Sequence, residues 1–141
     1  MFKPPIRSLL AGGLLVVAVF GAATPALAAT FQVKHGQNVA VTSLTDKEVT
    51  LCDGENDGYA VQVQYERASG NGGAFWESRG SGACATSGSG TVITRMKVCE
   101  QRSLGADNCT GWVTNPNLGF APPVITEEDL RREAEDPYMY R

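Results

Sequence analysis

The chain has few of the residues, and none of the short motifs, on which common enzymes depend. It contains one histidine, His35, and its four cysteines are too far apart to form the close pairs of a zinc site. No H-E-x-x-H, phosphate-binding glycine loop, dinucleotide fingerprint or G-x-S-x-G sequence occurs. Acidic residues outnumber basic ones by 15 to 12, and no basic stripe is present to bind nucleic acid. The sequence therefore predicts a non-enzymatic protein with no cofactor, no metal site and no nucleic-acid partner.

Apart from one N-terminal stretch, the chain also lacks a long apolar run. Residues 9–23 are uncharged and apolar, Lys3 and Arg7 come before them, and residues 26–28 have the small-x-small pattern of a signal-peptidase site. We therefore predict a signal peptide over residues 1–28, cleaved after Ala28, and a secreted, extracellular protein with no membrane partner. The alternative is an uncleaved membrane anchor. Three glycines that weaken a helix, together with the clean cleavage pattern, argue against it.

Removal of the signal peptide leaves 113 residues, enough for one small domain. Ten of the twelve basic residues then remain beside all fifteen acidic ones, a net charge of −5. We assign residues 29–115 to this domain and residues 116–141 to a tail that contains proline and acidic residues. Export also places the cysteines in an oxidising compartment, where they are expected to pair.

Alternating apolar and polar residues predict an all-β fold. The two clearest strands, residues 58–67 and 91–101, each carry one apolar face. These faces comprise Tyr59, Val61, Val63 and Tyr65 in the first strand, and Val92, Thr94, Met96 and Val98 in the second. Weaker strands are expected at residues 31–34, 38–42, 48–52, 74–77 and 110–113. About seven short strands, with no long helical pattern between them, predict a small two-sheet antiparallel β-sandwich of immunoglobulin-like size.

Turn-forming residues separate these strands. Residues 53–58 and 70–73 have the composition of hairpin turns, and residues 80–90 contain so much glycine and serine that we expect a surface loop.

The tail predicts one short helix. Thr126 is expected to cap its N-terminus, Asp136-Pro137 to end it, and Glu128 to pair with Arg132 one turn later. Because only two apolar residues lie in this helix, it can bury little. We expect either a short helix or a disordered tail, with residues 138–140 frayed at the end.

Four cysteines allow three disulfide pairings. They are Cys52, Cys84, Cys99 and Cys109. If Cys99 lies opposite Cys109 in a hairpin, Met96 lies opposite Trp112 on the inner face and the disulfide lies on the outer face. Hydrophobic pattern and disulfide then agree on one register, which favours the Cys99–Cys109 pairing. The second bridge is then Cys52–Cys84, which would tether the glycine-rich loop.

Two features could carry chemistry, and each has a simpler explanation. A lone histidine such as His35 is usually a solvent-facing or hydrogen-bonded side chain. Asp53, Glu55 and Asp57 match the start of a calcium loop, but the twelfth position is Gln64 and strands flank the segment. We therefore expect a solvated acidic turn there.

Two other residue pairs invite a functional interpretation. Glu66 and Glu77 could form a glycosidase pair, although nothing in the sequence distinguishes them from other glutamates. Phe75 and Trp76 could belong to a recognition surface beside the glycine-rich loop. Because neighbours on a strand point to opposite faces, we expect one ring in the core and the other covering a sheet edge.

Several segments around the cysteines resemble a group of short exported proteins of actinobacteria. These segments are Cys52-Asp53-Gly54, Gly82-Ala83-Cys84, Val98-Cys99-Glu100 and residues 108–113. The resemblance covers residues 47–113. It implies secretion and two disulfides, and it assigns no activity and no site residues.

The leading hypothesis is a secreted domain that binds an extracellular protein or carbohydrate partner. One alternative is an inhibitor of a secreted hydrolase, which would present a rigid loop. Another is a small secreted enzyme, which the missing catalytic motifs disfavour. A flat aromatic patch would favour the binding domain, a stiff convex loop the inhibitor, and a deep pocket with converging polar groups the enzyme.

Overall fold

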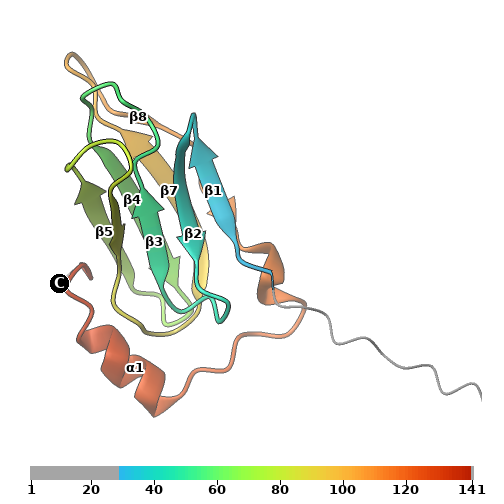
Figure 1. The fold of residues 1–141 in the computed structure, drawn as a ribbon. Helices are drawn as coiled ribbons and strands as arrows, with labels where there is room; N and C mark the ends of the chain where they lie inside the picture. The colour runs from blue at the N-terminus through green and yellow to red at the C-terminus, as the bar shows by residue number, and fades with distance from the viewer. Residues whose placement is uncertain (1–28, 141) are drawn as a thin grey trace, which may run out of the picture.

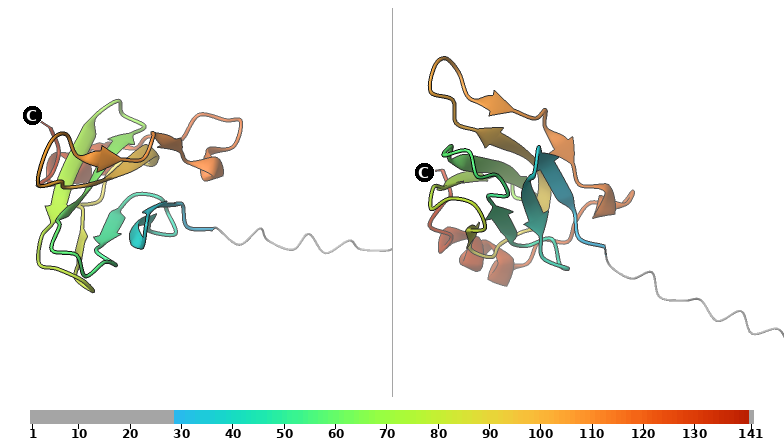
Figure 2. Two further views of the ribbon diagram at one scale, coloured as in Figure 1. Left: turned by 90° about the horizontal axis from the view of Figure 1, so that it is seen from above. Right: turned by 45° about the horizontal axis from the view of Figure 1, so that its top comes forward.

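A computed structural model describes residues 29–140, and the predicted signal peptide lies outside this range. The chain forms two antiparallel sheets stacked face to face, with one α-helix across one end (Figure 1). Viewed from above, the sheets are two separate layers (Figure 2). The predicted β-sandwich is confirmed. No helix among residues 29–140 has the length and apolar character needed to cross a membrane.

We call the two layers sheet A and sheet B. Sheet A has the strand order β1 (Gln32–His35), β2 (Asn38–Thr42), β3 (Val49–Cys52) and β6 (Cys84–Thr86). Sheet B has the order β5 (Gly72–Glu77), β4 (Val61–Arg67) and β7 (Ile93–Glu100), with two short strands beyond β7. These are β8 (Asn108–Cys109) and β9 (Val113–Thr114). A 3-10 turn, η1 (Pro116–Leu118), and the helix α1 (Glu127–Ala134) follow.

The core lies between the sheets and is built from alternate residues of the strands. Its largest contributors from sheet B are Val61, Val63, Tyr65, Phe75, Ile93, Met96 and Val98. Sheet A adds Phe31, Val33, Ala40, Val49 and Leu51. The face predicted for residues 58–67 is confirmed from Val61 onward, whereas Tyr59 lies before β4 and is partly exposed.

The inner face of β7 differs from the prediction at its start. Glu66 pairs with Arg95 but Arg67 pairs with Ile93, so Thr94 is an extra residue that bulges out of the ladder. After the bulge the inward residues of β7 have even numbers, as in Met96 and Val98, whereas before it the inward residue is Ile93. Ile93 is therefore fully buried, and Val92 and Thr94 are only half-buried.

Two predicted turns have other roles. Residues 53–58 do not form a hairpin, because they carry the chain from β3 in sheet A to β4 in sheet B. Residues 80–90 are not simply a loop, because they contain β6. Cys52 lies directly opposite Cys84, and the Thr50 and Thr86 hydroxyls are 2.8 Å apart two pairs further along. A turn does join β4 to β5 at the place predicted, but it ends at Asn71, because Gly72 and Gly73 already pair with β4 as part of β5.

Both disulfides have the expected pairing. Cys52 is bonded to Cys84 and Cys99 to Cys109, and each pair joins residues that face each other on neighbouring strands. Both lie toward the end of the sandwich that is distant from α1 (Figure 1).

The expected position of Trp112 is wrong. Cys99 pairs with Cys109, but Met96 pairs with Val113 rather than Trp112, so one extra residue lies between β8 and β9. The Val98 N–H is satisfied by the Thr110 hydroxyl, 3.1 Å away, instead of by a backbone carbonyl. A shift of one residue moves a side chain to the opposite face. Trp112 therefore lies on the outside of sheet B.

The tail is ordered and docks on the sandwich. Thr126 caps α1 by accepting a hydrogen bond from the Asp129 N–H, and Glu128 pairs with Arg132, both as predicted. The buried face of α1 is polar, however, and Leu130 is partly exposed. Residues 138–140 are not frayed: backbone hydrogen bonds join Tyr138 and Tyr140 to β5.

Buried polar contacts hold this tail in place. The guanidinium of Arg67 lies 2.9 Å from the Asp136 carboxylate, and both side chains are 0% exposed. The Tyr65 hydroxyl donates to the same carboxylate at 2.6 Å. Burial and this carboxylate raise the pKa of Tyr65, so its hydroxyl remains a donor. One turn earlier, Glu133 accepts hydrogen bonds from side chains of the β4–β5 turn and from Thr91.

Candidate functional site

Two places in the described residues gather groups that could recognise a ligand. One is a cluster of three carboxylates at the disulfide end of the sandwich. The other is the outer surface of sheet B.

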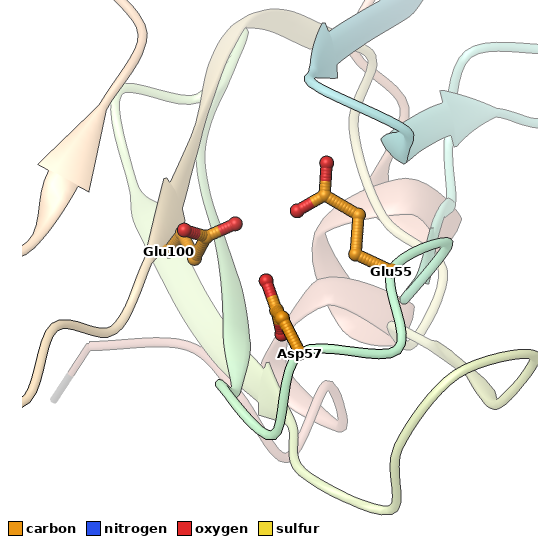
Figure 3. Close-up of side chains that lie close together, drawn as sticks. All are labelled: Glu55, Asp57 and Glu100. Atoms are coloured by element: carbon orange, nitrogen blue, oxygen red, sulfur yellow. The ribbon is translucent and has the colours of Figure 1, made fainter.

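The carboxylate cluster combines Glu55 and Asp57, from the link between the sheets, with Glu100 at the end of β7 (Figure 3). One carboxylate oxygen from each lies within 4.8 Å of the other two. Asn38 is fully buried beside them and donates to Glu55 at 3.3 Å and to Glu100 at 3.2 Å. The cluster therefore ties the two sheets together at this end.

Local backbone geometry brings Glu55 to this position. The Gln37 N–H donates to Glu55 Oε1 at 2.9 Å, just after a turn in which Gly36 has a φ of +60°. A Cβ at Gly36 would lie 2.1 Å from that oxygen, so any other residue there would displace the Glu55 side chain as well as adopt a strained φ. The backbone N–H of Gly54 donates to Asn38 in the same region.

The environment pushes the pKa values of two of these carboxyls apart. Burial, the hydrogen bond with Glu55 and the charge of Asp57 raise the pKa of Glu100. The Gln37 backbone N–H, followed by the contact with Glu100, lowers the pKa of Glu55. Glu100 therefore holds a proton to higher pH than its neighbour does.

His35 lies at the margin of this cluster rather than in open solvent. Its Nδ1 is 3.9 Å from Glu100 Oε2, and its side chain is only 16% exposed. Within residues 29–140 no cysteine is free to pair with it, because all four are in disulfides, and its Nδ1 is buried without a hydrogen-bond partner.

These carboxylates are the groups of residues 29–140 that could hold a hard cation. Calcium takes six to eight oxygen ligands, and the three side chains supply only part of such a shell. Asp53 of the calcium-loop hypothesis is not among them: it is buried and accepts from the Glu55 N–H at 2.9 Å. The turn is also not simply solvated, because Glu55 is anchored by hydrogen bonds on two sides.

The two glutamates of the glycosidase hypothesis do not come together. Glu66 and Glu77 lie on opposite faces of sheet B, and each is paired with an arginine of its own. The hollow beside Glu100, of about 290 Å³, is lined by neither Glu55 nor Asp57.

The outer surface of sheet B is of a different kind. We call it the aromatic face, defined by Trp76, Trp112 and Tyr140 around the central residues Gln62 and Gln64. The three aromatic side chains are 41%, 38% and 62% exposed, in that order. Gln62 lies opposite Trp76, and the Gln62 side chain accepts a hydrogen bond of 2.9 Å from the side-chain amide of Gln64.

The aromatic side chains sit at three positions around this face. Trp76 is on β5 near its end, and Tyr140 packs beside Gly72 at the beginning of the same strand. Trp112 is at the opposite edge, next to β9. Three strand spacings of about 4.8 Å separate β5 from β9, so the strand that carries Trp76 and the strand beside Trp112 lie roughly 14 Å apart.

Trp112 is held by two cationic side chains of β7. The Arg95 guanidinium carbon lies 4.6 Å and Lys97 Nζ 5.1 Å from the centre of the ring. Arg95 is itself fixed by two hydrogen bonds of 2.7 Å to Glu66. Cation–π contacts of this kind orient an aromatic ring before a ligand arrives.

Comparison with known proteins adds no family to this geometry. No family model, curated protein or solved structure matches the chain. Function is therefore inferred from the two sites alone.

The sequence pointed to only part of the aromatic face. The expected alternation of Phe75 and Trp76 is confirmed, with Phe75 buried and Trp76 outside. The prediction that Trp112 lies on the inner face is wrong. The alternation that identified the inner residues of residues 58–67 also marks Gln62 and Gln64 as outward, and this signal could have located the centre of the face.

Proposed function

We propose that the protein is a non-enzymatic extracellular binding domain whose aromatic face binds a carbohydrate chain. The tryptophan rings would stack on the apolar faces of sugar rings. The amides between them would exchange hydrogen bonds with sugar hydroxyls, since each amide offers both donors and an acceptor.

The observation that carries this proposal is the spacing of exposed aromatic rings and amides on one rigid sheet. The central strands β4 and β7 are paired on both sides, which keeps the outward glutamines of β4 in fixed positions, so little ordering entropy is lost there on binding. Tryptophans at opposite edges of the sheet, beside strands roughly 14 Å apart, suit an extended ligand of several sugar units better than a single small molecule.

The features of the described residues favour carbohydrate over the other partners considered. An inhibitor loop should project, whereas the glycine-rich segment is anchored: Gly82 donates to the Asp53 carbonyl at 2.8 Å, and β6 pairs with β3. A stable protein interface usually has an apolar, fully desolvated centre. The centre of the aromatic face consists of two glutamines.

Export is part of the same proposal. We infer that residues 1–28 are a signal peptide cleaved after Ala28 and that the protein acts outside the cell. Two disulfides support this, because such bonds persist in oxidising compartments.

The proposal is tested by measuring binding of the mature protein to polysaccharides. A panel of soluble and insoluble glycans, including xylan, cellulose and chitin, is screened by affinity electrophoresis and pull-down. Trp76→Ala and Trp112→Ala should each weaken binding about tenfold or more. Tyr59→Ala is the matched control, because Tyr59 is comparably exposed but lies outside the face.

Circular dichroism and thermal melting check that each variant is folded. Absence of binding to every glycan would contradict the proposal. So would binding that both tryptophan variants retain in full.

A further inference from the structure

We propose that the carbohydrate bound at the aromatic face is acidic, and that Lys97 pairs with a sugar carboxylate at Trp112. This inference rests on the proposed function and specifies its ligand class. It follows from how charge is distributed over sheet B.

The outward side chains of sheet B include one carboxylate, and that carboxylate is already occupied. Glu66 accepts both hydrogen bonds from Arg95, an ion pair in which the two charges offset each other. The other outward residues of the face are neutral apart from Lys97. Among the described residues, Lys97 has no carboxylate within ion-pair distance.

The position of Lys97 matches what a uronic acid would require. Its Nζ lies 5.1 Å from the centre of the Trp112 ring, so a sugar in contact with that ring comes within reach of the ammonium group. The ring would take the apolar side of the sugar, and the ammonium would take the carboxylate. A charge-assisted hydrogen bond of this kind is about twice as strong as a neutral one.

The rest of the molecule makes this face distinctive. The predicted mature chain carries a net charge of −5, so a polyanion is repelled by most of the surface. The aromatic face, with one uncompensated positive charge, is a place where a polyanion is attracted. Complementary charge of this kind sets both the orientation of a ligand and the choice between ligands.

Polyuronates and their neutral ester provide the test. Affinities of the full mature protein are measured for polygalacturonate, alginate, hyaluronate and fully methyl-esterified polygalacturonate, at low and moderate salt. At least one acidic polymer should bind about tenfold more tightly than the neutral ester, and salt should reduce the difference. Lys97→Met should remove that preference, so that this variant binds the acidic polymer no more tightly than it binds the ester.

Lys34→Met is the matched control, because Lys34 lies on an exposed position of β1 in sheet A. This variant should keep the preference for acidic polymers. The inference is overturned if no acidic polymer is preferred, or if the preference survives in Lys97→Met.

The same experiment separates this inference from the proposed function. Binding of neutral glycans that depends on Trp76, without any acidic preference, overturns the inference and leaves the proposed function in place. Absence of binding to all polymers overturns both.

Discussion

Replacing Asp136 by asparagine removes the counter-charge of a guanidinium that has no access to water. Asp136 Oδ2 accepts from Arg67 at 2.9 Å and from the Tyr65 hydroxyl at 2.6 Å. Its Oδ1 accepts from the backbone N–H groups of Gly88 at 3.1 Å and Tyr138 at 3.2 Å. Asparagine has one acceptor oxygen, so its amide N–H₂ must face two of these donors whichever way it is turned.

The expected cost follows from these contacts. Two buried donors lose their acceptor, each at about 1–3 kcal/mol, and the Arg67 charge is left unpaired. Removing one partner of a buried ion pair costs about 3–5 kcal/mol in comparable cases. For a domain of this size, that corresponds to a fall in Tm of roughly 12–20 °C.

Urea unfolding followed by tryptophan fluorescence and circular dichroism measures this loss directly. Glu128→Gln is the control, because Glu128 pairs with arginines on the exposed side of α1 and its replacement should leave the transition almost unchanged. A loss below about 1 kcal/mol for Asp136→Asn would refute this reasoning.

Three further predictions concern the disulfide end of the sandwich. Replacing both cysteines of the β3–β6 bridge by alanine should cost about 4 kcal/mol, against about 3 kcal/mol for the shorter β7–β8 loop, as measured by urea unfolding; the reverse order would contradict the loop-entropy argument. The folded chain holds the Glu100 proton more tightly than the unfolded chain does, because the pKa of Glu100 is raised on folding. The stabilisation that results is fully present below the ordinary pKa of 4.5 and is lost as pH rises through the folded-state pKa. Glu100→Gln should therefore match the wild-type urea midpoint at pH 4 and exceed it at pH 7; a lower midpoint at pH 7 would argue against a raised pKa. Gly36→Ala should lose about 2 kcal/mol or more and release Glu55, whereas Gly58→Ala, with φ of +78° but open space around it, should lose only about 1 kcal/mol in thermal melts.

The sandwich could be predicted because it follows from patterns within single strands. The alternation in residues 61–65 identifies an inner face by itself. The disulfide pairing is also confirmed, but the register that favoured it is wrong by one residue, since Met96 lies opposite Val113 and not Trp112. Alternation can be read within one strand, whereas the register between two strands depends on the contacts that join them.

The errors come from contacts between distant residues. Trp112 lies on the outer face because the Thr110 hydroxyl, rather than a backbone carbonyl, accepts the hydrogen bond from the Val98 N–H. Residue propensities do not predict such a contact. The tail docks through charged groups that a hydrophobicity argument counts as solvated, and Arg67 meets Asp136 across 69 positions. Glu100 joins Glu55 for the same reason: only the stacking of two sheets brings them together.

The distance along the chain between Asp136 and Arg67 has a consequence for folding during synthesis. Asp136 follows Arg67 by 69 positions, so the guanidinium must stay hydrated until that later segment has emerged. The two layers therefore cannot close at the α1 end before residue 136 is available. A chain cut short before this residue would remain open at that end.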